Sequence, residues 1–210
     1  MKVWQCSVCK YVHKGDAPPE KCPVCGVDSS KFIEIDEASI PAKSPRKKGG
    51  SEEKTTSPVP KAASARTVYE QINAALLKHH AHPISVHTPN GVLPIAVILF
   101  VLAWFFDSQL FVKAAVINLV FVFCALPLVI YTGILEWKTK YNRALTTIFK
   151  IKITAAAITC ASCIIVLVWY LFNPQILNSS VAWVFLAINI IMLSAAGIAG
   201  HIGGKLVFKD

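Results

Sequence analysis

Four long apolar runs in the second part of the chain limit its fold more than any other feature of the sequence. They cover about residues 84–106, 112–135, 150–172 and 181–203. The hydrocarbon core of a bilayer is about 30 Å thick, and a helix needs roughly 20 residues to cross it. Each run is therefore long enough for one crossing. The sequence predicts an all-α bundle of four transmembrane helices over residues 83–208.

Turn residues, and not charges, separate the third run from the fourth. Between Ile153 and Gly204 there is no formally charged residue. However, Asn173-Pro174-Gln175 and Asn178-Ser179-Ser180 interrupt the apolar stretch with residues that favour turns. We therefore expect two crossings in this stretch and not one.

The composition divides the chain into a soluble, basic first part and an apolar second part. Of the 210 residues, 54% are hydrophobic and 16% are charged. Residues 1–83 carry 13 Lys/Arg and 9 Asp/Glu, whereas residues 84–210 carry 8 and 3. A secreted disulfide scaffold or a nuclear nucleic-acid binder would not need such an apolar half. We expect contact with membrane lipid and no nucleic-acid partner.

The loops between the runs predict the orientation in the membrane. The connection between the second and third runs has five basic residues. The connection between the first and second runs has Asp107 and Lys113, and the one between the third and fourth runs has no charge. The five basic residues are Lys138, Lys140, Arg143, Lys150 and Lys152. Cytoplasmic loops carry an excess of Lys and Arg. The sequence thus predicts a multi-pass protein of the bacterial cytoplasmic (inner) membrane with both termini in the cytoplasm.

Three shorter segments precede the predicted bundle. Residues 1–36 contain four cysteines, and their start has no apolar signal segment, so we expect this module to stay in the cytosol. Residues 37–66 are rich in Pro, Lys and Arg and have the composition of a flexible basic linker. Residues 67–82 place apolar side chains at helical spacing, which predicts an amphipathic helix at the membrane interface.

Two Cys-x2-Cys pairs predict a metal site in residues 1–36. The pairs are Cys6/Cys9 and Cys22/Cys25, with 12 residues between them. Two such turns can supply four thiolates to one tetrahedral metal ion. Because zinc and iron both accept this ligand set, the spacing leaves the metal open. A disulfide pairing is disfavoured in a reducing cytosol.

The residues around the cysteines resemble a rubredoxin domain with the short spacer found in rubrerythrins. The resemblance runs from Trp4 to His13 and from Gly15 to Gly26, and then includes Phe32. It implies a small β module that holds one redox-active iron on the four cysteines. Lys10 departs from the family, which usually has glycine after the second ligand. A structural zinc ribbon is the alternative.

Histidines mark both ends of the predicted bundle. His82-Pro83-x3-His87 opens it and Gly200-His201-x-Gly203-Gly204 closes it. These motifs resemble the two ends of a family of four-span bacterial membrane domains, DUF2231, over roughly residues 80–208. That resemblance implies a fold and not an activity.

Ionisable residues inside a membrane span are costly and are usually functional. Ser194, Gly197, His201 and Gly204 share one face of the last predicted helix, which leaves room beside the imidazole. We expect a haem b with His87 and His201 as axial ligands and His82 as the second candidate. Two alternatives remain. In the first, the glycines of the last helix only allow close packing of helices, and there is no cofactor. In the second, His82, His87 and His201 bind a non-haem metal.

Glu136 and Trp137 follow the second apolar run. Trp137 suits an interfacial anchor. For Glu136 we favour a solvated position at the rim of the membrane, with a proton path to a quinone as the alternative.

These features together predict a membrane-bound electron-transfer protein. Single electrons would pass between a cytosolic flavoprotein reductase, the iron module, the haem b and a quinone or oxygen species. Whether such a chain has turnover as an oxidoreductase is left open by the sequence. The alternatives are a zinc-ribbon interaction or sensor module on a membrane anchor, and a metal-handling or transport protein with a histidine site.

Overall fold

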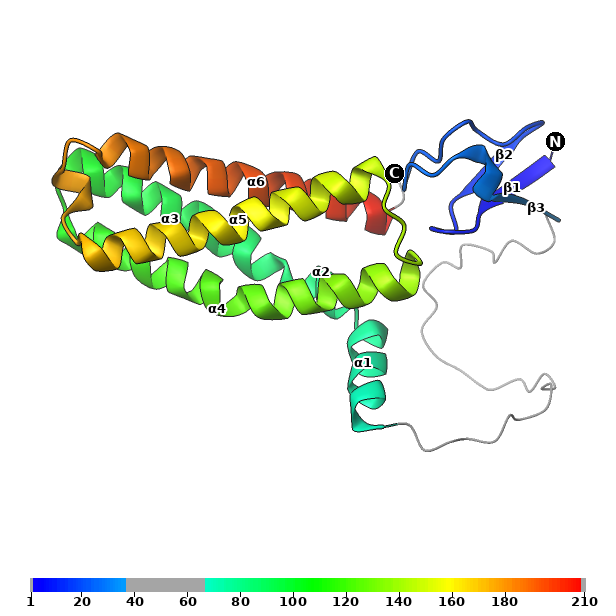
Figure 1. The fold of residues 1–210 in the computed structure, drawn as a ribbon, viewed down its shortest axis with the longest axis horizontal. Helices are drawn as coiled ribbons and strands as arrows, with labels where there is room; N and C mark the ends of the chain where they lie inside the picture. Colours follow the sequence, from blue (N-terminus) through cyan, green and yellow to red (C-terminus); the bar gives the residue numbers. More distant parts are fainter. Residues whose placement is uncertain (1, 37–66, 209–210) are drawn as a thin grey trace, which may run out of the picture.

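A computed structural model describes residues 2–36 and 67–208, without the side chain of Phe208. The linker predicted for residues 37–66 lies outside the described residues. The described parts form a small β module, called the head below, and a helical membrane domain (Figure 1).

The head is built on a three-stranded antiparallel sheet in the order β2-β1-β3. The strands are β1 (Lys2–Cys6), β2 (Val12–Gly15) and β3 (Phe32–Ile35), and the short helix η1 (Ser29–Lys31) precedes β3. In the central strand Gln5 pairs with Val12 on one side and with Ile33 on the other. The sheet thus holds the turn after Cys6 close to the aromatic side chain of Phe32, as the rubredoxin resemblance implies.

Two short helices lead into the membrane domain. The helix α1 (Val68–Lys78) begins with a capping box, in which Thr67 and Glu70 satisfy each other's backbone N–H groups. It ends at Lys78, and the left-handed backbone of His80 (φ 51°) then turns the chain into α2 (Ala81–Ser85). Figure 1 shows α1 crosswise to the long helices. Its Val68 and Ile72 are exposed.

Four long helices follow, and each is long and apolar enough to cross a membrane. They are α3 (His87–Phe106), α4 (Gln109–Lys140), α5 (Thr147–Phe172) and α6 (Ala182–Phe208). Helices are favoured here because they satisfy every backbone hydrogen bond within the segment, which lipid cannot do. The helices differ from the predicted runs at several ends, and α6, like α4, continues five residues beyond its run. The first run is broken at Val86, between α2 and α3, and α4 continues five residues beyond residue 135.

The membrane domain is apolar both inside and outside. Phe100 and Phe185 meet edge to face in its core, with ring centroids 5.1 Å apart. On the outer surface Phe121, Ile165 and Trp183 are exposed, each by 48% or more. An outer surface of this kind is unfavourable in water and favourable against lipid.

The two ends of the bundle differ in composition. We call the end that carries the α4–α5 loop and the last turn of α6 the head end, because the head lies beside it (Figure 1). At the far end, Asn178 donates a hydrogen bond to Asp107 over 2.8 Å, and Gln109 donates one to Gln175 over 3.2 Å. The short helix η3 (Ile176–Asn178) closes that end. The head and the end of α6 thus both lie at the head end of the bundle (Figure 1).

Candidate metal centre and polar site

Two tight turns shape the cysteine site in the head. The N–H of Lys10 donates to the carbonyl of Cys6 over 2.9 Å, and the N–H of Gly26 donates to that of Cys22 over 2.8 Å. Both turns end in a left-handed residue, with φ of 61° at Lys10 and 73° at Gly26. Lysine is strained in this conformation and glycine is not. Lys10 therefore keeps the geometry of the first turn at a cost in stability.

The four thiols have the spacing that a tetrahedral metal site needs. Their sulfur atoms all lie within 4.8 Å of one another, and all four residues are buried. The Sγ–Sγ distance is 3.7 Å between Cys6 and Cys25 and 3.5 Å between Cys9 and Cys22. A tetrahedron with metal–sulfur bonds of about 2.3 Å has edges of about 3.8 Å. Cys6, Cys9, Cys22 and Cys25 can thus hold one metal ion.

Without a metal, the thiols share protons unequally. A hydrogen bond from the Cys25 thiol lowers the pKa of Cys9 to about 5. The same hydrogen bond raises the pKa of Cys25, and burial raises the pKa of Cys22 to about 11. Because metal ligands must be thiolates, binding of a metal ion displaces the protons that Cys22 and Cys25 retain at neutral pH.

The head packs its cysteine site against the head end of the membrane domain. One buried apolar cluster contains Val8 and Val24 from the head and Phe149 and Leu206 from α5 and α6. A Cβ atom built on Gly26 would lie 3.6 Å from Ile148. We call this contact the docking interface. It covers the metal site on the side that faces the membrane domain.

Tyr141, at the end of α4, lies between the docking interface and the interior of the membrane domain. Its ring centroid is 5.0 Å from that of Phe149, and its hydroxyl donates to the carbonyl of Leu206 over 3.4 Å. Burial raises the pKa of Tyr141 to about 12, with smaller contributions from the negative charges of Glu136 and Cys9. Tyr141 is therefore a neutral group at neutral pH, placed between the cysteines and Glu136.

Trp137, near the end of α4, contacts both the head and the α4–α5 loop. It is half-buried beneath the head, next to the docking interface, and its indole N–H donates to the carbonyl of Ala144 over 2.9 Å. Trp137 thus fixes the α4–α5 loop that carries part of the docking interface.

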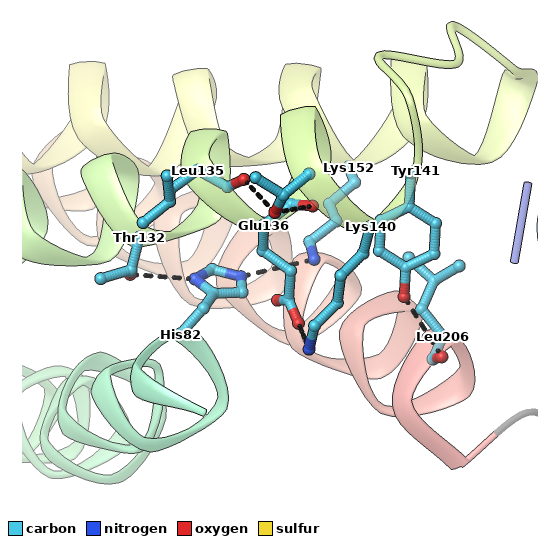
Figure 2. A network of polar contacts seen from close by, with 9 residues as sticks. His82, Thr132, Leu135, Glu136, Lys140, Tyr141, Lys152 and Leu206 are labelled. Carbon is cyan, nitrogen blue, oxygen red and sulfur yellow. Dashed lines mark hydrogen bonds and ion pairs between the residues drawn. The ribbon is translucent and has the colours of Figure 1, made fainter. Parts of the chain in front are cut away.

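A second polar site lies on the membrane-domain side of Tyr141 (Figure 2). His82 Nδ1 is 3.3 Å from Thr132 Oγ1, and His82 Nε2 is 3.5 Å from Lys152 Nζ. The Thr132 hydroxyl donates to the carbonyl of Leu128 over 2.8 Å. Since its one proton is used there, Thr132 accepts from an N–H at Nδ1 of His82. Nε2 is then the acceptor that faces the ammonium of Lys152.

Glu136 is buried in this site. It is 8% exposed, and its carboxylate forms an ion pair with Lys140, with 2.5 Å between Glu136 Oε1 and Lys140 Nζ. The solvated rim position favoured by the sequence is therefore wrong. The reason is that α4 continues to Lys140, so that Glu136 lies on the inner face of a helix instead of in a loop.

A glycine of α4 makes room for the imidazole of His82. Gly133 is required for this, because a Cβ atom there would lie 2.9 Å from Cε1 of His82. Gly203 of α6 only adjoins the site, since a Cβ atom there would lie at an ordinary contact distance of 3.6 Å from Nζ of Lys152. The polar site is thus formed by α2, α4 and α5, with α6 beside it. Sequence reasoning missed Thr132 and Lys152. A usable signal was present, because Thr132, Glu136 and Lys140 follow one another at four-residue spacing along one face of an apolar helix.

The two histidines favoured as haem ligands, His87 and His201, lie outside this polar site. His87 and His201 are exposed, and so are their neighbours His79 and His80. A Cβ atom at Gly197 or Gly204 would meet nothing within 4 Å, so the cleared face of α6 points out of the bundle.

Gly200, by contrast, packs against Asn90 of α3, since a Cβ atom there would lie 2.6 Å from its Nδ2. Close helix packing therefore explains this glycine.

The histidines also do not gather into a metal site. Within residues 2–36 and 67–208, the four cysteines are the only group of three or more His, Cys, Asp or Glu side chains placed to hold a metal ion. Of the three histidines considered as cofactor ligands, only His82 is half-buried with polar partners. A haem b on His87 and His201 gains no support from these positions and stays a prediction.

Comparisons with known proteins match both parts of the chain. Residues 4–33 match the family described as rubrerythrin, rubredoxin-like domain, and residues 78–210 match the family described as predicted membrane protein (DUF2231). Reverse rubrerythrin-1 of Clostridium acetobutylicum is 51% identical over 35 residues, which are 17% of this chain. The match covers only 19% of that relative's length. No solved structure matches the chain.

Proposed function

Since the chain belongs to the DUF2231 family of predicted membrane proteins and has a rubredoxin-like head, we propose that it is a membrane-bound electron-transfer protein. The docking interface is the observation that carries this proposal. Val8 and Val24, which lie inside the two Cys-x2-Cys turns, are 8% and 0% exposed and belong to one cluster with Phe149 and Leu206 of the membrane domain. A head that served only to bind a soluble partner would have no need of this contact.

The proposed ligands are Cys6, Cys9, Cys22 and Cys25. An iron ion held by four thiolates supplies a one-electron couple, and zinc in the same site supplies none. The residues around the thiols keep water away from them and hold them in place. An apolar shell of this kind tunes the potential of a metal site and controls access to it.

The orientation of the protein is also part of the proposal. The head end carries Lys138, Lys140, Arg143, Lys150 and Lys205, whereas the far end carries Asp107 and a single basic residue, Lys113. Lys and Arg are enriched on the cytoplasmic side of membrane proteins. We therefore assign the head to the cytoplasmic face of a bacterial inner membrane, where a flavoprotein reductase can reduce it.

The proposal does not require the haem b predicted from the sequence. Electrons from the docked head would pass through the protein in the direction of Tyr141, directly to an acceptor on its membrane side. If purified protein does contain a haem, His201→Ala and His87→Ala are the variants that should alter its spectrum, and His79→Ala is their control.

A zinc ribbon that recognises a partner from a membrane anchor is the second candidate. The sulfur spacing of the site supports it equally, because zinc accepts the same tetrahedral thiolate set. The two candidates differ in one measurable property, since only the iron form takes up an electron.

Metal content and redox titration of the full chain test the proposal. Protein made in iron-replete cells and held in lipid nanodiscs should contain one iron, and its ferric-thiolate absorption should disappear on uptake of one electron and return on oxidation. Cys9→Ser should lose this absorption, and Cys124→Ser, on the exposed surface of α4, should keep it. Stoichiometric zinc without iron would establish the second candidate instead.

A further inference from the structure

A small cavity leads from the head end of the membrane domain to the polar site. It lies between α1 and α2 on one side and α4 on the other, and it has room for about one water molecule. Its polar lining comes from His80, His82, Thr132, Glu136 and Lys140. A water molecule there can donate to the carboxylate of Glu136 and accept from the ammonium of Lys140. The cavity can thus hold water, and a larger molecule does not fit.

The polar side chains of α4 follow one another from the head end inwards. The side chain of Lys140, the last residue of α4, is 39% exposed, and that of Glu136 is 11% exposed. Thr132, one turn further in, is 2% exposed. Ionisable groups inside a membrane domain are costly, and chains of carboxylates and histidines there serve as proton relays. The path from the exposed lysine to His82 therefore suits a proton.

His82 is the group that can bind a proton at the end of this path (Figure 2). Since its Nδ1 carries the hydrogen that Thr132 accepts, Nε2 is the ring nitrogen with a lone pair. Thr132 is in turn 3.2 Å from the hydroxyl of Ser85, so that polar contacts from α2 and α4 hold the ring. Histidine is the side chain whose unperturbed pKa allows a change of charge between pH 5 and 8.

The charges around His82 come from α4 and α5. Lys152 of α5 and Glu136 and Lys140 of α4 act on the ring electrostatically. The other titratable group that lines the cavity is His80, and α1 lines it with apolar side chains. Because Glu136 and Lys140 form an ion pair, Lys152 leaves one net positive charge beside the ring. A proton on His82 is therefore opposed by Lys152 and favoured by a negative charge added nearby.

The docked head is a source of such a charge. Reduction of ferric to ferrous iron adds one negative charge to a site of four thiolates. Tyr141 lies between the two sites, and the charges of Cys9 and Glu136 both act on it. The apolar cluster of the docking interface keeps water away from the head's side of Tyr141. Charges interact more strongly where water does not screen them, so reduction of the head favours a proton in the polar site.

We propose that His82 takes up one proton from the water at the head end when the docked head takes up one electron. This inference rests on the proposed function, whose reductant supplies the electron that converts ferric to ferrous iron. The proton passes Glu136 by way of the cavity and binds at Nε2 of His82. The ring becomes an imidazolium ion, and its Nδ1–H keeps the bond to Thr132. The added proton offsets the charge of the added electron.

The midpoint potential of the iron centre as a function of pH tests this proton uptake in the full chain in nanodiscs. A proton bound on reduction makes reduction less favourable as the pH rises. Between pH 6 and pH 8 the affinity for the electron should fall by about fivefold or more, which is the lower end of the usual coupling between two sites. A pH-indicator dye should show uptake of protons during reduction and their release on oxidation.

Two variants should remove the pH dependence by different routes. His82→Gln removes the proton acceptor, and Leu206→Glu leaves His82 in place but separates the head from the membrane domain. Their matched controls are His79→Gln, at an exposed histidine after α1, and Val207→Glu, at an exposed position of α6. Both controls should keep the full pH dependence. Because Leu206→Glu does not alter the polar side chains, it remains informative even if His82→Gln fails to fold.

A third pair of variants tests the cavity as the route of the proton. Leu76→Trp fills the cavity, and Leu128→Trp adds the same bulk to an exposed position of α4. After rapid photoreduction of Leu76→Trp, the response of the dye should lag behind the loss of the ferric-thiolate absorption. In Leu128→Trp the two signals should coincide.

Three results would overturn the proton site. These are a midpoint potential of the unmodified protein that does not change with pH, the same pH dependence in His82→Gln as in His79→Gln, and the same pH dependence in Leu206→Glu as in Val207→Glu. If the iron centre still takes up its electron reversibly, the proposed function stands and only the proton site fails. A chain that takes up no electron would overturn both.

Discussion

At the scale of single residues, Cys6, Cys9, Cys22 and Cys25 form one candidate metal site, and Glu136 is buried in the membrane domain. Four cysteines in two Cys-x2-Cys pairs point to one site because the spacing itself sets the geometry. Spacing does not predict the burial of Glu136, because that burial depends on where α4 ends and on which residues pack against Glu136. The same holds for His82 and His87, where only the fold shows which ring is half-buried.

Replacement of Lys10 tests the strain at the first cysteine turn. Lys10→Gly should stabilise the head by roughly 0.5–1 kcal/mol, because glycine adopts a positive φ without the penalty paid by lysine, less the entropy it gains when unfolded. The midpoint of a denaturation curve followed by thiolate–metal absorption measures the change. Lys10→Asn should give a smaller gain. A lower midpoint for Lys10→Gly would show that the lysine side chain makes a stabilising contact.

At the scale of elements, the four transmembrane helices follow from composition alone. A run of apolar residues with the length of a bilayer has few other solutions than a helix. The details at the head end do not follow. The break at Val86 and the continuation of α4 to Lys140 depend on the packing of α2 against α4, which gives Thr132 and His82 their polar partners.

Reporter insertions in two loops test the orientation of these helices. A reporter inserted after Asn142, in the basic α4–α5 loop, should show a cytoplasmic location. One inserted after Ser179, between α5 and α6, should show a periplasmic location. The asymmetry of Lys and Arg between the two ends is the physical reason. A periplasmic reading at Asn142 would invert the bundle and remove the head from its proposed reductant.

At the scale of the whole molecule, the docking interface is the feature that sequence reasoning did not predict. It joins Val8 and Val24 to Phe149 and Leu206, which are more than a hundred residues apart in the chain. Such a contact depends on the fit of two surfaces, and no periodicity or spacing in the sequence encodes it. The sequence predicts a flexible linker for residues 37–66, which lie outside the described residues, and it gives no sign that the head is seated on the membrane domain, as the structure has it.

The rate of electron transfer from the reduced head to a quinone confined to liposomes tests the account most directly. Leu206→Glu places a charge in the docking interface, and Val207→Glu places the same charge at the neighbouring, exposed position of α6. Both variants should keep the ferric-thiolate spectrum, because neither touches the cysteines. Leu206→Glu should slow the transfer by about tenfold or more, since it removes the high local concentration of the docked head. Val207→Glu should leave the rate unchanged. Equal rates in the two variants and the unmodified protein would contradict the account.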